Sequence, residues 1–383
     1  MHLMNQTFSQ SEKNRPLSAS ADPELERELA TVLRQMHDEI STIPGIPHLS
    51  AIVLGGSYGR GEGGCVRDRD GRSHPHNDLD FFVFTSGARK REQRRIDAAL
   101  AEIGRRYART LGIDVDFAPA REEKTLSCVS RTLMFQELRR GYRILYGTNA
   151  FLKYLPRLPF EKLPAAETLR LLMNRGVGLL LALQKSISSP GEEEFIRRNH
   201  AKAVLGCGDA LLLASGRYSA SARDRRASMA AWAAEPGAPA MLRDFAPVYE
   251  RTAEWKLQVR EQPVSSFDPA LLREAVHQWQ NTLICVIQLY SGSKAGQIET
   301  CLYEIGKNPL FQSGRRWKNG IFSLLYFRRG YTQIGFFSSP RLKVLEQLTR
   351  FLEEIDRQGT SSSAECFFSP DFCAMIKRWR RFS

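Results

Sequence analysis

Short apolar runs that end at glycine mark the first third of the chain. Residues 51–54 are apolar throughout and are followed by Gly55-Gly56, which predicts a buried strand and then a tight turn. Apolar side chains then alternate at Leu79, Phe81 and Val83, so a second strand is expected with these three facing the core. Two further strands are predicted, over residues 112–120 and 142–146.

Helical spacing governs most of the remaining chain. Asp22-Pro23 is typical of a helix N-cap and first turn, and a helix is expected from residue 23 to about Glu39. A basic helix is predicted at 89–109, and a short one at 132–140. Beyond residue 150 the apolar period is helical, with helices expected at 169–183, 193–216, 238–262 and 269–290 and a loop at 219–226.

These patterns divide the chain into three parts. Residues 1–22 are polar and rich in serine, and are predicted to form a disordered tail. Residues 23–150 mix strands and helices, and residues 151–383 are expected to be helical, with the boundary near Gly147–Phe151. The predicted fold class is α+β, a small mixed-sheet domain followed by an all-α helical region.

Pairs of aspartates mark two of the predicted strands. Asp78 and Asp80 are two positions apart, so both carboxylates project from the same face of their strand. Adjacent carboxylates repel each other unless a cation lies between them, and hard oxygen ligands suit Mg²⁺. Asp114 and Asp116 have the same spacing, and a third carboxylate joins the cluster if the two strands pair. Such a cluster is typical of two-metal sites, with ions ~3.5–4 Å apart.

A glycine turn precedes these aspartates. Gly55 and Gly56 let backbone N–H groups approach an anion closely, and the hydroxyl of Ser57 adds a further donor. Together, the turn and the carboxylates indicate a site that binds a phosphate chain and a metal ion.

Three segments in order, GGSYGRGE, NDLDFFVF and IDVDFAPA, resemble the DNA polymerase β-like nucleotidyltransferase superfamily. The likeness covers about residues 50–150 and is closest to bacterial stand-alone members with a helical C-terminal region. One departure is the gap of 21 positions between Ser57 and Asp78, which is longer than usual in the family and indicates an inserted loop.

The resemblance implies a small mixed-sheet nucleotidyltransferase domain that moves an NMP from an NTP to an acceptor hydroxyl. It implies that Gly56 and Ser57 bind the β- and γ-phosphates. Gly55, in the same turn, and Arg60, which follows it closely, are expected to be further nucleotide-binding residues. Asp78, Asp80 and Asp116 would be the catalytic and metal-binding carboxylates, holding Mg²⁺ or Mn²⁺. Asp116, which precedes Phe-Ala-Pro, matches the third carboxylate better than Asp114 and would help deprotonate the acceptor.

The inserted loop, residues 61–77, could be a metal site or a mobile flap. Asp68, Asp70, His74 and His76 are metal-ligating residue types, but the remaining ligands of a calcium loop are absent at their spacing. The loop is therefore interpreted as a mobile flap over the site.

Net charge and cysteine content limit the expected partners and the expected compartment. The 383 residues have a net charge of +13, which indicates an anionic partner such as a nucleotide, a nucleic acid, an acidic glycan or a membrane surface. Seven scattered cysteines without a C-x-x-C pair are typical of a reducing compartment. With no apolar leader and no membrane-length apolar run, the expected location is cytoplasmic, without a membrane span.

The helical region leaves alternatives open. Lys202 and Asp209 share a helix face, and either form ion pairs in a bundle or position the acceptor. Basic and aromatic residues interleave at 315–318 and 377–381, which suits nucleic acid or a basic surface with tryptophans in the core. The acceptor, a small molecule or a protein, is expected to bind the helical region and to be anionic, and nucleic acid is possible but less favoured. The rival interpretation is a non-catalytic nucleotide- or nucleic-acid-binding protein that keeps the same fold.

Overall fold

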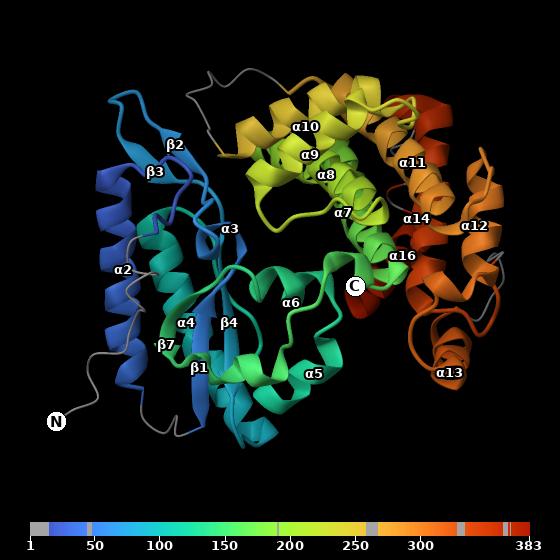
Figure 1. The fold of residues 1–383 in the computed structure, drawn as a ribbon. Coiled ribbons are helices and arrows are strands. Elements are labelled where there is room, and N and C mark those ends of the chain that lie inside the picture. Colours follow the sequence, from blue (N-terminus) through green and yellow to red (C-terminus); the bar gives the residue numbers. More distant parts are fainter. Residues whose placement is uncertain are drawn as a thin grey trace. The chain divides into compact units, whose positions relative to one another are not determined.

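The computed structural model describes residues 15–43, 48–189, 191–257, 267–327, 334–362, 367 and 369–383. The protein is mixed α/β, with a small mixed sheet in its N-terminal part and a mostly helical C-terminal region (Figure 1). Its contacts define two compact units. Unit 1 comprises Met1–Phe160, Ala220–Ala222 and Ala253–Pro263, and unit 2 comprises Glu161–Ser219, Arg223–Thr252 and Val264–Ser383. The first break lies at residues 160 and 161, beyond the expected boundary near Gly147–Phe151.

Unit 1 is built on a five-stranded sheet in which β5, β4, β1 and β7 are neighbours in that order and β6 also pairs with β4. β1 is antiparallel to β4 and β7, whereas β5 and β6 are parallel to β4. The strands are β1 (Leu49–Leu54), β4 (Leu79–Thr85), β5 (Val115–Phe117), β6 (Arg121–Glu122) and β7 (Arg143–Gly147), with a separate hairpin of β2 (Cys65–Arg67) and β3 (Ser73–Pro75).

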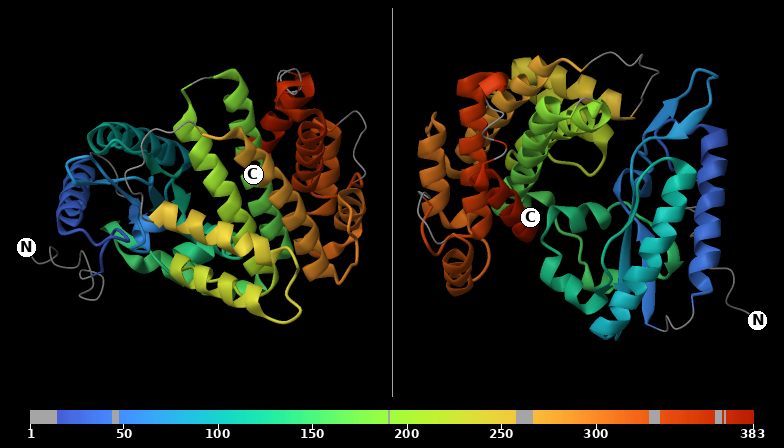
Figure 2. Two further views of the ribbon diagram at one scale, coloured as in Figure 1. Left: turned by 90° about the horizontal axis from the view of Figure 1, so that it is seen from above. Right: turned by 180° about the vertical axis from the view of Figure 1, so that it is seen from behind.

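Two hydrophobic clusters cover the two faces of this sheet. Ile52, Leu54, Phe81 and Val83 pack against the long helices on one face, α2 (Pro23–Ser41) and α4 (Lys90–Leu111). The intervening strand residues Ala51, Val53 and Phe84 pack on the other face against short helical segments. These are α5 (Leu126–Val129), α6 (Leu133–Leu138) and η2 (Asn149–Tyr154). Unit 1 also contains α3 (Gly56–Gly59) and η1 (Glu123–Thr125), and η3 (Phe160–Lys162) begins at its last residue and continues into unit 2. Figure 2 shows α2 and α4 side by side on their face of the sheet.

The start of α2 confirms the expected capping and corrects the predicted tail. Asp22 caps the helix by accepting hydrogen bonds from the backbone N–H groups of residues 24 and 25. Leu17 and Ser18, within the stretch expected to be disordered, are buried, and Ser18 forms a β-bridge with Gly63. Glu26 accepts hydrogen bonds of 2.7 Å from both of their backbone N–H groups. The prediction is therefore wrong for these residues, because an internal carboxylate holds a segment whose own composition is polar.

The inserted loop also contains an ordered hairpin. β2 and β3 pair in antiparallel register, and Ser73 is buried, with its hydroxyl donating to Asp22 at 2.9 Å. Tyr58 anchors the base of the hairpin, because its buried hydroxyl donates to the Gly64 carbonyl oxygen at 2.7 Å. These polar contacts tie the base of the hairpin to the rest of unit 1, and its role as a mobile flap over the site stays a prediction.

Unit 2 is helical, and α7, α8 and α11 form its centre. The expected loop at 219–226 is partly wrong, since a helix already begins at Ala222. No helix in the described part of the chain is long and apolar enough to span a membrane. The helices are α7 (Ala165–Ser188), α8 (Glu193–Ala214), α9 (Ala222–Ala234), α10 (Leu242–Leu257), α11 (Pro269–Ser291), α12 (Ile298–Lys307), η4 (Pro309–Phe311), α13 (Arg316–Tyr326), α14 (Pro340–Ser362) and α16 (Pro370–Phe382). The first residue of α9 and the last five of α10 are assigned to unit 1.

Two tryptophans, one on α11 and one on α16, form hydrogen bonds with α7. Trp279 of α11 is fully buried and donates its indole N–H to the Leu172 carbonyl oxygen at 2.9 Å. It lies so close to Gly176 that a Cβ there would be 2.8 Å from the Trp279 ring. Trp379 of α16 donates to the side-chain oxygen of Asn174 at 2.9 Å. Asn174 therefore has a structural contact within unit 2.

Candidate active site

The parallel pairing of β4 and β5 brings the predicted carboxylates together. Asp80 is the direct partner of Asp116 across this ladder. The N–H group of Leu79 donates to the Asp114 carbonyl oxygen at 2.9 Å, and Asp78 and Asp114 are the residues immediately before β4 and β5. Asp80 and Asp116 therefore lie side by side near the start of the two strands, and Asp78 and Asp114 lie at the same end of the sheet, just before the strands begin.

The glycine turn after β1 lies against the same end of the sheet. The Gly55 N–H group donates to the Asp80 carbonyl oxygen at 2.8 Å. Gly56 has φ of +59°, a left-handed conformation that favours glycine, and a Cβ built on it would be 2.7 Å from an Asp80 carboxylate oxygen. Two independent reasons, backbone conformation and close approach, therefore require glycine at position 56.

The turn continues directly into the single helical turn α3. Its first backbone bonds run from the Gly59 N–H group to the Gly55 carbonyl oxygen and from the Arg60 N–H group to that of Gly56. The N–H groups of residues 56–58 precede these donors and lack acceptors within the turn. Ser57 is only half-buried, so the turn presents backbone donors and one hydroxyl beside the carboxylates.

The electrostatics of the cluster are visible at Asp116. Burial, and then the negative charges of Asp114 and Asp78, raise the pKa of the Asp116 carboxyl above its ordinary value. Three of the four carboxylates are therefore close enough to influence one another. Asp114, whose role the sequence left open, belongs to this group, and its spacing from Asp116 repeats that of Asp78 from Asp80.

The donor set fits a hard divalent cation by its chemistry and backbone position. Carboxylate oxygens are the ligands Mg²⁺ prefers, and neighbouring strands lie only ~4.7–4.9 Å apart. In the conformations seen here, no three His, Cys, Asp or Glu side chains of the described residues converge closely enough to hold a metal ion. Binding an ion therefore requires the aspartate side chains to turn about their own bonds, while the backbone already has them adjacent.

Arg60, predicted to contact a phosphate, already has a carboxylate neighbour. Its Nε atom lies 3.6 Å from an Oε atom of Glu62, and both side chains are mostly buried. The stem of Arg60 packs so closely on Gly141 that a Cβ there would be 2.4 Å from the arginine Cγ atom. These contacts describe a structural role, and a phosphate contact by Arg60 stays a prediction.

Asp209 of α8, one of the two polar residues expected to share a face of this helix, has partners within unit 2. Asp209 lies 2.9 Å from Arg225 and accepts a 2.8 Å hydrogen bond from the Tyr249 hydroxyl. Burial, followed by the charge of Asp209, raises the pKa of Tyr249 well above its ordinary value. Asp209 is thus part of an internal network of unit 2, which favours the structural interpretation of this residue.

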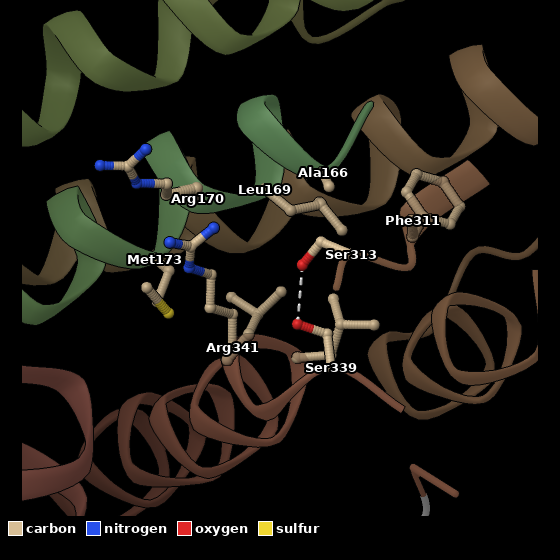
Figure 3. A pocket seen from close by; sticks show the side chains of 10 residues that line it. Ala166, Leu169, Arg170, Met173, Phe311, Ser313, Ser339 and Arg341 are labelled. Atoms are coloured by element: carbon tan, nitrogen blue, oxygen red, sulfur yellow. Dashed lines mark hydrogen bonds between the residues drawn. The ribbon is translucent and has the colours of Figure 1, made fainter. Parts of the chain in front are cut away.

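Unit 2 also contains a small pocket with arginine side chains in its lining (Figure 3). It is lined by Arg170, Arg341 and apolar side chains, and a 2.9 Å hydrogen bond joins Ser313 and Ser339 across it. Arg170 lies 3.4 Å from Glu167, and Arg341 donates to the Phe382 carbonyl oxygen. The enclosed space holds about one water molecule, so the pocket does not accommodate a nucleotide.

Comparison with family models and with curated proteins finds no match to this chain. The functional proposal therefore stands on the geometry of unit 1 and on the motifs that occupy its site.

Proposed function

We propose that unit 1 is a metal-dependent nucleotidyltransferase domain of the polymerase β-like type. It moves an NMP from an NTP to a hydroxyl group of a small-molecule or protein acceptor. The observation that supports this most directly is the contact of the Gly56 turn with Asp80, which is itself paired with Asp116. A phosphate chain bound on that turn is necessarily next to the carboxylates.

The turn supplies the phosphate contacts. The backbone N–H groups of residues 56–58 and the Ser57 hydroxyl bind the β- and γ-phosphate oxygens as hydrogen-bond donors. A side chain at position 56 would occupy the space beside Asp80, so glycine keeps the phosphates close to the carboxylates.

The carboxylates would bind the cation, and one of them would accept the proton of the acceptor hydroxyl. Asp78, Asp80 and Asp116 would bind Mg²⁺ or Mn²⁺, with Asp114 beside them. When bound, the ion supplies charge neutralisation at the phosphates and lowers the pKa of a hydroxyl group near it. The raised pKa of Asp116 suits a carboxylate that accepts a proton during the reaction.

The transfer step exchanges one phosphorus–oxygen bond for another. The acceptor oxygen forms a bond to the α-phosphorus, and the bond between that phosphorus and the bridging oxygen of the β-phosphate breaks. The hydroxyl proton passes to Asp116, and pyrophosphate leaves with the electron pair of the broken bond. The turn keeps contact with the leaving group while Asp80 and Asp116 stay beside the reacting phosphorus.

The experiment uses the full chain with each NTP labelled in turn at the α- and γ-phosphate, with Mg²⁺ or Mn²⁺. Acceptors include aminoglycosides, sugars, RNA and a protein extract. We expect label from the α-phosphate, and none from the γ-phosphate, in one acceptor class, with equimolar pyrophosphate release that EDTA abolishes. The control is the double variant Asp80→Asn/Asp116→Asn.

Equilibrium binding of each NTP, with and without metal, separates the possible outcomes. Metal-dependent NTP binding that the double variant loses supports the site even before an acceptor is found. NTP binding that ignores both metal and the double variant overturns the assignment. If NTP binding depends on metal but no acceptor class supports pyrophosphate release, the non-catalytic alternative is favoured.

A further inference from the structure

Helix α13 presents its large apolar side chains to solvent. Trp317, Ile321, Leu324 and Leu325 lie on one face of the helix, and each is 49–57% exposed. Asn319 and Ser323, on the opposite face, are polar and pack inward, and Gly320, which is also buried, lies at the edge of the apolar face one turn before Leu324. This is the reverse of an ordinary surface helix, which buries its apolar stripe.

Buried polar contacts fix this orientation. Asn319 donates to the Ser313 carbonyl oxygen at 3.0 Å, and the Ser323 hydroxyl donates to the Phe336 carbonyl oxygen at 2.6 Å. Lys343 of α14, which is 2% exposed, donates to the Ser323 hydroxyl at 2.7 Å. Turning α13 to bury its leucines would leave the Lys343 ammonium group without this partner, which is costly inside a protein.

Two phenylalanines extend the apolar surface. Phe336 and Phe337 are 50% and 52% exposed, with ring centroids 5.2 Å apart in an edge-to-face arrangement. A Cβ at Gly320 would lie 2.9 Å from the Phe337 ring, so the pair sits directly against α13. We call this surface the α13 patch; it consists of Trp317, Ile321, Leu324, Leu325, Phe336 and Phe337. Contiguous apolar surfaces of this kind mark interaction sites.

The segment of the chain that carries the α13 patch has charge of one sign. From Ile305 to Leu345 the sequence contains no aspartate or glutamate. Arg315, Arg316 and Lys318 are exposed at the start of α13, and the Lys318 ammonium nitrogen lies 5.4 Å from the centroid of the Trp317 ring. The patch therefore combines an apolar surface with a cationic rim.

We propose that the α13 patch binds the surface of an anionic phospholipid bilayer, with its apolar side chains among the acyl chains and its basic rim at the headgroups. Half of the patch, Ile321, Leu324 and Leu325, is aliphatic and offers no ring on which a base could stack, whereas acyl chains can contact all six side chains, which favours lipid over nucleic acid as the occupant. A second copy of the chain would bring the same cationic rim against itself. The inference is independent of the catalytic proposal for unit 1.

The test is co-sedimentation of the full chain with vesicles of phosphatidylcholine alone or mixed with phosphatidylserine. We expect binding to the anionic vesicles that weakens with salt, and at least ~10-fold weaker binding for Ile321→Ser/Leu324→Ser/Leu325→Ser. These side chains are half-exposed, so the variant should keep its melting temperature. Leu271→Ser/Leu289→Ser, two exposed leucines of α11, is the matched control and should bind as the wild type does.

Two further measurements complete the test. Brominated lipids should quench the fluorescence of Trp317. Quenching should therefore be observed for the wild type and be lost in the variant Trp317→Phe. Arg315→Glu/Arg316→Glu should remove the preference for anionic vesicles. Absence of vesicle binding, or binding that the triple serine variant retains, overturns the proposal. So does a dimer that the triple variant converts to a monomer, or an oligonucleotide that binds through these residues while vesicles do not.

Discussion

Asp80 and Asp116 are direct partners on the adjacent parallel strands β4 and β5. The two residues are far apart in sequence, and no local pattern requires that they meet. Their pairing brings two aspartate pairs together at the end of the sheet where the glycine turn after β1 also lies. This arrangement, and the polar networks that support the two units, have consequences that can be measured.

Replacing either partner with asparagine should nearly abolish nucleotidyl transfer. A metal site contributes several kcal/mol of transition-state stabilisation, so Asp80→Asn and Asp116→Asn should each lower kcat by about 10²–10⁴-fold. The measurement is single-turnover transfer from an α-labelled NTP. Asp70→Asn, at an exposed position of the β2–β3 hairpin, is the matched control and should be unchanged.

Asp114→Asn should lose less activity than Asp116→Asn, because Asp116 rather than Asp114 is the partner of Asp80. If Asp114→Asn proves the inactive variant, the assignment of the third carboxylate is wrong.

Alanine at position 56 should impair nucleotide binding beyond its cost in stability. Gly56→Ala puts a side chain in a left-handed conformation, which costs about 1–2 kcal/mol, and pushes a methyl group against the Asp80 carboxylate. Denaturant unfolding measures the first effect, and NTP affinity the second. Gly71→Ala is the matched control, since Gly71 also has positive φ (+80°) but a Cβ at that position would have no atom within 4 Å.

Gly56→Ala should therefore lose at least as much stability as Gly71→Ala, and only Gly56→Ala should weaken NTP binding, by roughly tenfold or more. Equal affinities in the two variants would show that the turn does not contact the nucleotide.

Asp116 should make folding less favourable as pH rises. Because its pKa is higher in the folded protein than the ordinary 3.8, its contribution to stability is fully present below 3.8 and is lost as pH rises through the folded value. At pH 7, without metal, Asp116→Asn should melt at the same temperature as the wild type or higher. Adding Mg²⁺ should raise the melting temperature of the wild type more than that of the variant.

The comparison is made by thermal melts at pH 4 and pH 7, with and without Mg²⁺. A variant that is clearly less stable than the wild type at pH 7 without metal contradicts a strained carboxylate at this position.

The buried network of unit 2 should be more sensitive to loss of its cation than to loss of its hydroxyl. Arg225→Met leaves the Asp209 carboxylate without its ion pair, at a cost of about 3–5 kcal/mol. Tyr249→Phe removes one hydrogen bond to a charged group, at about 1.5–3 kcal/mol. Urea unfolding measures both; a near-neutral Arg225→Met would mean that the network contributes little to stability.

Local patterns were sufficient to predict the central strand and the first helix of unit 1. Leu79, Phe81 and Val83 alternate along the sequence, and all three are buried as predicted. Asp22-Pro23 and the helical apolar spacing after it placed the first helix, observed at Pro23–Ser41. Such predictions succeed because a strand or helix face is set by residues only two to four positions apart.

Contacts between distant residues produced the departures. Leu17 and Ser18 are ordered because Glu26 accepts their N–H groups, and the loop after Gly61 forms a hairpin that Tyr58 and Asp22 hold. Trp317 provides the clearest case, because one interpretation of the sequence placed such tryptophans in the core and it is 57% exposed.

The sequence by itself determined which residues can form strands, helices, a glycine turn and two aspartate pairs, since these depend on neighbouring positions. Only the tertiary structure decided that Asp116 pairs with Asp80 and that α13 turns its leucines outward. Strand pairing and helix rotation depend on partners far along the chain: β5 beside β4 in one case, and Lys343 at the Ser323 hydroxyl in the other. Rotating α13 to bury its apolar stripe would take the Ser323 hydroxyl away from the buried Lys343 ammonium group, and an uncompensated buried charge is costly.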